Sequence, residues 1–282
     1  MEIKRTSKSV NYFIEIYHKM GIDFSLKHGT YTTTIETMLG KQKFVTNKYS
    51  NRVFVAANMI KKDVINSVKG QRIISGTYKK TNYANSRKYT DLSFPEVLNI
   101  DLNSAYASCL LINDLITQKT FDYLKGLKKE ERLPCVGMLA QSNTTFIYEG
   151  GKCVDMKPFR APTYQVFYYL ISEINYLMND IQFELGNDFI FYWVDGVFFM
   201  PDTKPSKIRN VENMVQELGY SFKYEEVKDF RYTKILDKFV VEMTKNKDHK
   251  RYEFQDSEIG LDLRKELNTR AKNDLKDRFT FS

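Results

Sequence analysis

The feature of this sequence that most constrains its fold is the apolar segment 189–200, FIFYWVDGVFFM, which is interrupted by Asp195 and Gly196. A membrane-spanning helix needs about 18 or more apolar residues, so the segment is too short to form one. Apolar and aromatic residues on both sides of an Asp-Gly step are typical of two buried strands that a tight turn connects. Asp195 then lies within a buried hairpin, where a carboxylate is costly unless its charge is compensated.

A second isolated carboxylate, Asp101, ends the short apolar run 97–100. The residues that follow, 102–112 (LNSAYASCLLI), predict a turn into a short helix. Each aspartate has an ordinary alternative, since Asp101 can cap the helix and Asp195 can be a turn residue. Taken together, they are the hard oxygen ligands that Mg²⁺ prefers, because this ion commonly takes one or two protein carboxylates plus substrate phosphates.

The rest of the chain predicts several helices and strands. Apolar residues at helical spacing indicate a first helix over 6–20 and a long amphipathic helix over 163–181. Further elements are predicted as follows: a short helix over 60–68 that ends at Gly70, a charged helix over 117–133, a hairpin over 146–156 turning at Gly150 and Gly151, a helix over 205–218, and strands over 230–243 and 250–255.

Composition narrows the classes of protein that fit. Hydrophobic residues make up 42% of the chain and aromatic residues 14%, which excludes intrinsic disorder. Lys and Arg number 43 against 35 Asp and Glu, and this excess favours a polyanionic partner such as nucleic acid, although simple solubility is the alternative. The three cysteines and three histidines have no paired spacing, so no zinc site is expected. We expect a cytoplasmic protein without a membrane partner.

One segment combines basic and aromatic side chains. Residues 77–90, TYKKTNYANSRKYT, interleave tyrosines with lysines and arginines in a pattern suited to phosphate contacts and base stacking. The candidate nucleic-acid-binding residues here are Lys79, Lys80, Arg87 and Lys88. A solvated loop explains the same composition equally well.

Two of these segments resemble motifs of family B DNA polymerases, closest to the protein-primed branch of viruses and plasmids. Residues 101–108, DLNSAYAS, are similar to motif A, whose pattern is Asp-x-Asn-Ser-Leu-Tyr-Pro. Residues 192–199, YWVDGVFF, resemble motif C, Tyr-x-Asp-Thr-Asp-Ser-Val-Phe. Only the second motif C aspartate is present, because Trp193 stands where the family has the first.

Two weaker similarities concern basic residues. Lys129 lies as far before Gly137 as the motif B lysine lies before its glycine, while Leu133 and Val136 replace the family's Asn and Tyr. Arg132 is an alternative phosphate ligand in the same segment, and a solvated helix is the ordinary explanation. For the family's Lys-x-Tyr motif, Lys238 fits the placement and residues 250–252 fit the letters; we favour Lys238.

The resemblance implies an α+β fold, in which a palm-like antiparallel sheet is backed by helices and carries small helical N- and C-terminal additions. It divides the chain into an N-terminal helical or mixed region (1–75), a palm with reduced fingers at about 110–140 (76–255), and a charged tail or thumb remnant (256–282). The N-terminal region is too short for the proofreading exonuclease domain that most such polymerases carry.

The activity that the resemblance implies is that of a DNA polymerase or primase-like nucleotidyltransferase, which adds nucleotides to a nucleic-acid or protein primer on a DNA template. Its partners would be template and primer DNA, nucleoside triphosphates and, for the protein-primed branch, a terminal protein or other replication proteins. Asp101 and Asp195 would hold two Mg²⁺ or Mn²⁺ ions, and Lys129 or Arg132 would contact the triphosphate. The remaining substrate-binding residues would be Leu102, Asn103 and Ser104 through backbone amides and Tyr106 under the deoxyribose, with Lys238 on the DNA.

Two alternatives remain open from the sequence. A palm that has lost its activity could serve as a nucleic-acid-binding subunit in replication or defence, as Trp193 and the incomplete motif B suggest. The two aspartates could also belong to a metal-dependent phosphohydrolase that resembles the polymerases by coincidence.

Overall fold

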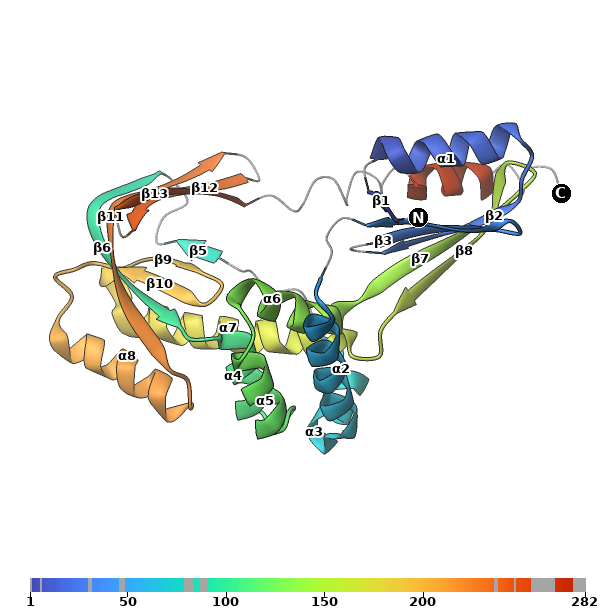
Figure 1. Ribbon diagram of the computed structural model, residues 1–282. Helices are drawn as coiled ribbons and strands as arrows, with labels where there is room; N and C mark the ends of the chain where they lie inside the picture. Colours follow the sequence, from blue (N-terminus) through green and yellow to red (C-terminus); the bar gives the residue numbers. More distant parts are fainter. Residues whose placement is uncertain are drawn as a thin grey trace. The chain divides into compact units, whose positions relative to one another are not determined.

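A computed structural model describes residues 2–5, 7–29, 32–45, 49–78, 84–86, 91–235, 238–245, 247–254 and 267–275 of the chain. Two compact units are present, and each is assembled from segments that are far apart in the sequence (Figure 1). The first unit comprises Met1–Asn51, Ala140–Tyr164 and Asp256–Ser282, and the second comprises Arg52–Leu139 and Gln165–Gln255. These units differ from the regions expected from the sequence, because residues 52–75 belong to the second unit and residues 140–164 to the first.

The first unit is built on a six-stranded sheet with the order β1-β4-β3-β2-β7-β8. Neighbouring strands are antiparallel except β1 and β4, which are parallel. The strands are β1 (Glu2–Lys4), β2 (Phe24–Gly29), β3 (Thr32–Thr37), β4 (Gly40–Val45), β7 (Ser142–Glu149) and β8 (Lys152–Arg160). The expected hairpin of residues 146–156 is therefore confirmed as β7 and β8, and it joins the N-terminal strands because β7 pairs with β2.

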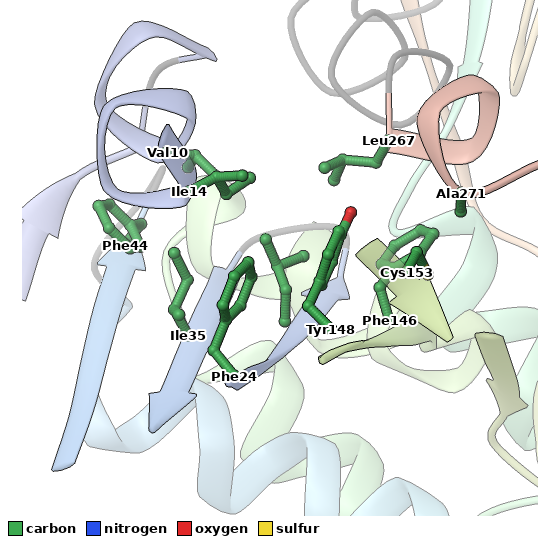
Figure 2. Packing of buried hydrophobic residues seen from close by; sticks show 11 residues of the cluster. Val10, Ile14, Phe24, Ile35, Phe44, Phe146, Tyr148, Cys153, Leu267 and Ala271 are labelled. Carbon is green, nitrogen blue, oxygen red and sulfur yellow. The ribbon is translucent and has the colours of Figure 1, made fainter. Parts of the chain in front are cut away.

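Two helices cover one face of this sheet: α1 (Ser7–Lys19) and a helix of residues 267–275 (Figure 1). Figure 2 shows their side chains packing on the strands, with Val10 and Ile14 from α1 and Leu267 and Ala271 from the C-terminal helix. The expected first helix is confirmed. The N-terminal region also contributes four strands, which the sequence did not predict.

The second unit contains a seven-stranded sheet with the order β13-β12-β11-β6-β10-β9-β5, in which every neighbouring pair is antiparallel. Its strands are β5 (Ala84–Ser86), β6 (Leu92–Leu102), β9 (Phe189–Trp193), β10 (Gly196–Phe199), β11 (Phe222–Ile235), β12 (Lys238–Lys245) and β13 (Asp248–Phe254). The expected strand 230–243 is wrong as a single element, because it divides between β11 and β12, which pair with each other. With helices packed on both sheets, the α+β fold class is confirmed.

Seven α-helices of the second unit are described: α2 (Asn51–Asn66), α3 (Val68–Ser75), α4 (Ala105–Ile112), α5 (Gln118–Lys125), α6 (Lys129–Gly137), α7 (Tyr164–Leu185) and α8 (Pro205–Glu217). The predicted amphipathic helix is confirmed as α7, whose apolar stripe is buried. The predicted charged helix 117–133 is two helices, because α5 ends at Lys125, just before Gly126, and α6 starts at Lys129.

Residues 52–75 belong to the second unit because α2 and α3 are bonded to the segment around α5. Asp63 of α2 accepts hydrogen bonds from the hydroxyls of Thr117 and Thr120. The expected end of a helix at Gly70 is wrong, since Gly70 lies inside α3. A Cβ at this position would lie 2.0 Å from the carbonyl oxygen of Val64, so only glycine allows α2 and α3 to approach so closely.

Among the described residues, no helix is both long enough and apolar enough to cross a membrane.

Candidate active site

The register of four neighbouring strands places the two candidate aspartates together. Asp101, near the end of β6, lies opposite Gly196 of β10 on one side and opposite Lys223 of β11 on the other. Gly196 in turn lies opposite Trp193 of β9. The backbone N–H of Leu102 donates to the carbonyl oxygen of Asp195 at 3.0 Å, which ties the end of β6 to the turn that carries Asp195.

The residues next to this row along each strand point to the opposite face of the sheet, which contacts helices. Tyr192, one residue from Trp193, receives a hydrogen bond from Asn175 of α7 at 2.7 Å. Tyr224, one residue from Lys223, donates to Glu212 of α8 at 2.8 Å. Because successive side chains of a strand point to opposite faces, the row of Asp101 and Lys223 belongs to the face away from α7 and α8.

The turn between β9 and β10 consists of Val194 and Asp195, not of Asp195 and Gly196 as the sequence suggested. Val194 has a φ of +56°, which is rare for a β-branched residue and matches the first position of a type II′ turn, where glycine is usual. Gly196 instead belongs to β10. A Cβ there would lie 3.3 Å from Asn99 Oδ1 and 3.5 Å from Asp101 Oδ1, so glycine leaves room for these two side chains.

A pocket of about 190 Å³ opens beside this row. Its lining contains both aspartates, the bases Lys129, Arg132 and Lys223, and an apolar wall that includes Leu124 and Leu133. The structure therefore gathers in one pocket the candidate catalytic and substrate-binding residues of the sequence analysis, which are Asp101, Leu102, Asn103, Ser104, Tyr106, Lys129, Arg132 and Asp195.

The segment between β6 and α4 differs from the expectation in one respect. The N–H of Leu102 is bonded to Asp195 and the N–H of Asn103 to the carbonyl oxygen of Ser221 at 2.8 Å. These two amides therefore already have partners, which corrects the expectation that they cradle a triphosphate. Ser104, the residue before α4, has a φ of +53°, and its hydroxyl accepts a hydrogen bond from Arg132 Nη1 of α6.

Burial and the neighbouring carboxylate of Asp101 raise the pKa of Asp195 to about 6, because both disfavour its ionised form. Lys129 and Lys223 act in the opposite direction. A carboxylate in this position is stabilised by any further positive charge that enters the pocket.

Two residues of the site were missed in the sequence. Lys223 forms an ion pair with Asp101, with its Nζ 3.2 Å from Oδ2. Asn99, two residues before Asp101, donates to Glu225 Oε2 at 3.2 Å, and its buried Oδ1 has no hydrogen-bond partner among the described residues. No local signal marks either residue, because each depends on how β6 and β11 pair.

The donor set suits a hard divalent cation. One carboxylate lies near the end of β6 and the other in the turn before β10, and the amide oxygen of Asn99 lies buried beside Asp101 near Gly196. Asp101 and Asp195 are the residues that would hold the ion. Within the described ranges, no group of three or more His, Cys, Asp and Glu side chains is arranged as a metal site, so further ligands would come from substrate or water.

The candidate DNA contacts are less well defined. Lys79, Lys80, Arg87 and Lys88 lie outside the described residues. Lys238 begins β12, where its backbone lies opposite Ile235. Trp193 packs against Tyr252 of β13 with 5.1 Å between ring centroids.

Comparison with models of known protein families finds no match, and comparison with curated proteins finds none either.

Proposed function

We propose that the chain is a metal-dependent nucleotidyltransferase, similar to the palm of family B DNA polymerases, that adds nucleotides to a nucleic-acid or protein primer on a DNA template. The observation that carries the proposal is the pairing of β6 with β10, which puts Asp101 and Asp195 side by side in a pocket that also contains Lys129 and Arg132. Carboxylates for a cation and bases for phosphates are the two requirements of phosphoryl transfer.

In this proposal the primer hydroxyl attacks the α-phosphorus of a nucleoside triphosphate, and pyrophosphate leaves as the new P–O bond forms. A bound Mg²⁺ or Mn²⁺ would lower the pKa of the attacking hydroxyl and offset charge on the phosphates. Lys129 and Arg132 of α6 bind the phosphate oxygens through charged hydrogen bonds. The hydrogen bond from Arg132 to Ser104 Oγ supports this role, since it orients the guanidinium group at the start of α4.

Tyr106 is the proposed contact to the sugar. It lies in the first turn of α4, five residues after Asp101 in the motif A-like segment, and it lines the same pocket. A ring beneath the deoxyribose would fill the space that a ribose 2′-hydroxyl requires.

The proposal is tested by replacing each aspartate with the uncharged amide of the same size. Asp101→Asn and Asp195→Asn should each reduce Mg²⁺- or Mn²⁺-dependent nucleotide incorporation about 10³-fold or more, because charge developing in the transition state loses its stabiliser. Asp180→Asn, an exposed position on α7, is the matched control and should retain full activity. Circular dichroism would confirm that all three variants fold, and full activity in both site variants would refute the mechanism.

A second candidate is a nucleic-acid-binding subunit with an inactive palm. It is favoured by the ion pair between Lys223 and Asp101 and by Trp193 in the place of a metal ligand. The same experiment separates the two candidates. An inactive wild type that binds primer-template DNA, with an affinity that neither Asp101→Asn nor Asp195→Asn changes, would favour the binding subunit.

A further inference from the structure

Lys223 occupies a position that pairs it directly with a candidate metal ligand. It lies opposite Asp101 across the antiparallel pairing of β6 and β11, and its Nζ is 3.2 Å from Asp101 Oδ2. The side chain of Asp101 is only 23% exposed and that of Lys223 is 47% exposed, so the pair lies at the rim of the pocket, where water screens it incompletely.

A second carboxylate holds Lys223 in this position. Glu225, two residues along β11 on the same face, accepts a hydrogen bond from Lys223 Nζ at 2.6 Å. Glu225 is itself bound by Lys245 of β12 and by the amide of Asn99. Burial raises the pKa of Glu225, but the hydrogen bonds and the charges of the two lysines together outweigh it, so that the pKa is lowered. It is a fixed anion that keeps the ammonium group of Lys223 beside Asp101.

The result is a row of alternating charges across three neighbouring strands: Asp101, Lys223, Glu225 and Lys245. These four charges cancel, and Asp195 adds one negative charge. Asp101 therefore already has a cation on one of its oxygens. A second divalent ion bridging both aspartates would meet the repulsion of Lys223 at short range.

The side chains available as metal ligands also favour a single ion. Among the described residues, no third His, Cys, Asp or Glu side chain joins the two aspartates as a metal group. Trp193, which occupies the row position next to Gly196, offers no oxygen ligand. Two carboxylates with a neutral amide oxygen nearby can hold one ion, and a second ion would have to share the Asp101 oxygen that Lys223 already contacts.

We propose that the ammonium group of Lys223, held by Glu225, takes the place of one of the two metal ions, so that the site binds a single divalent cation. The single-ion proposal rests on the proposed function, because it takes Asp101 and Asp195 as the metal ligands. It replaces the expectation of two ions, which came from the resemblance to family B DNA polymerases. The cation that the protein supplies would stay in place through each reaction cycle.

The test counts ions without using activity. Mn²⁺ alone is titrated into the full chain, and bound ions per chain are measured by electron paramagnetic resonance, with dipolar coupling as the signature of two neighbouring ions. We expect one uncoupled Mn²⁺ in the wild type and two coupled ions in Lys223→Met, which keeps an unbranched side chain one atom shorter and removes the charge.

Two further variants make the count specific. Lys223→Arg retains the charge and should bind one ion. Lys245→Met removes a positive charge from the same row without a contact to Asp101, so it should also bind one ion. Thermal unfolding shows whether each variant is folded.

The possible failures are distinguishable. Two coupled ions in the wild type, or a single ion in a folded Lys223→Met variant, would overturn the role of Lys223 and leave the proposed function standing. If the wild type binds no Mn²⁺, or if Asp101→Asn and Asp195→Asn leave its Mn²⁺ binding unchanged, both the role of Lys223 and the proposed function are overturned.

Discussion

Asp195 is the residue whose environment departs most from that of an ordinary turn aspartate. It is partly buried beside a second carboxylate, and its pKa is raised to about 6. The folded protein therefore binds a proton on Asp195 at pH values where the unfolded chain, with a pKa near 3.8, has released it. This group makes folding less favourable as pH rises from about 4 to 6, because the folded state resists the ionisation that the unfolded state accepts.

Asp195→Asn should remove this dependence. We expect the free energy of unfolding of the metal-free variant, relative to wild type, to increase between pH 4 and pH 6 by up to about 3 kcal/mol, since each unit of pKa shift corresponds to about 1.4 kcal/mol. Urea unfolding at a series of pH values measures the difference. The comparison with wild type cancels the opposite contribution of Glu225, whose pKa is lowered. Parallel curves for the two proteins would contradict the assignment.

Tyr106 is the residue on which the choice of sugar would depend. If its ring occupies the space of a ribose 2′-hydroxyl, Tyr106→Val should open a cavity that accepts ribonucleotides. The ratio of kcat/KM for deoxyribonucleotides over ribonucleotides, measured with the same template and metal, should fall about 10-fold or more in the variant. A wild type that already prefers ribonucleotides would indicate a primase and would remove the deoxyribose assignment while leaving the metal site intact.

At the scale of elements, the β9–β10 hairpin sets the geometry of the site through Gly196. The φ of Gly196 is not in the left-handed region. Glycine is therefore needed here because neighbouring atoms leave little room for a Cβ, and not because of the backbone conformation. A new Cβ would lie 3.3 Å from Asn99 Oδ1, a tight contact that requires Asn99 to move by a few tenths of an ångström, and 3.5 Å from Asp101 Oδ1, an ordinary contact.

We therefore expect Gly196→Ala to lower nucleotide incorporation about tenfold while the fold is kept, because a shift of Asn99 disturbs the surroundings of Asp101, and small errors of position at a catalytic site reduce the rate. Gly126→Ala is the matched control, since the nearest atom to its Cβ is the carbonyl oxygen of Tyr123 at 3.4 Å, an ordinary contact. Activity assays and thermal unfolding of both variants measure the effect. Equal activity of the two would show that the site tolerates the displacement.

The elements that the sequence predicted correctly are those with a local pattern. The apolar stripe of α7 and the glycine turn between β7 and β8 each signal their element within a few residues. The sequence analysis missed the split into α5 and α6, where Gly126 is the one strong helix breaker. It also missed the boundary between β11 and β12, where no strong breaker separates the two strands.

At the scale of the whole molecule, the first unit depends on segments from both ends of the chain. Leu267 and Ala271 of the C-terminal helix are buried in the same core as Phe24 and Ile35 of the N-terminal strands (Figure 2). Stability of the N-terminal sheet is therefore linked to residues more than 200 positions away in the sequence.

Leu267→Ala should destabilise this unit by about 2 to 5 kcal/mol, the usual cost of removing a buried leucine side chain. Hydrogen exchange of the amides in β2 and β3 measures the loss and locates it in the first unit. Lys272→Ala, an exposed position on the same helix, is the control and should change exchange little. Unchanged protection of β2 and β3 in Leu267→Ala would show that the helix does not support the sheet.

The sequence by itself identified the two candidate aspartates and most of the helices, because a carboxylate that ends an apolar strand and a helical stripe are patterns of neighbouring residues. Only the tertiary structure decided which residues surround the carboxylates. Lys223 reaches Asp101, and Asn99 reaches Glu225, through the register of β6 with β11, across more than 120 residues of chain. Strand pairing at that distance depends on the packing of the whole sheet, and no short stretch of sequence records it.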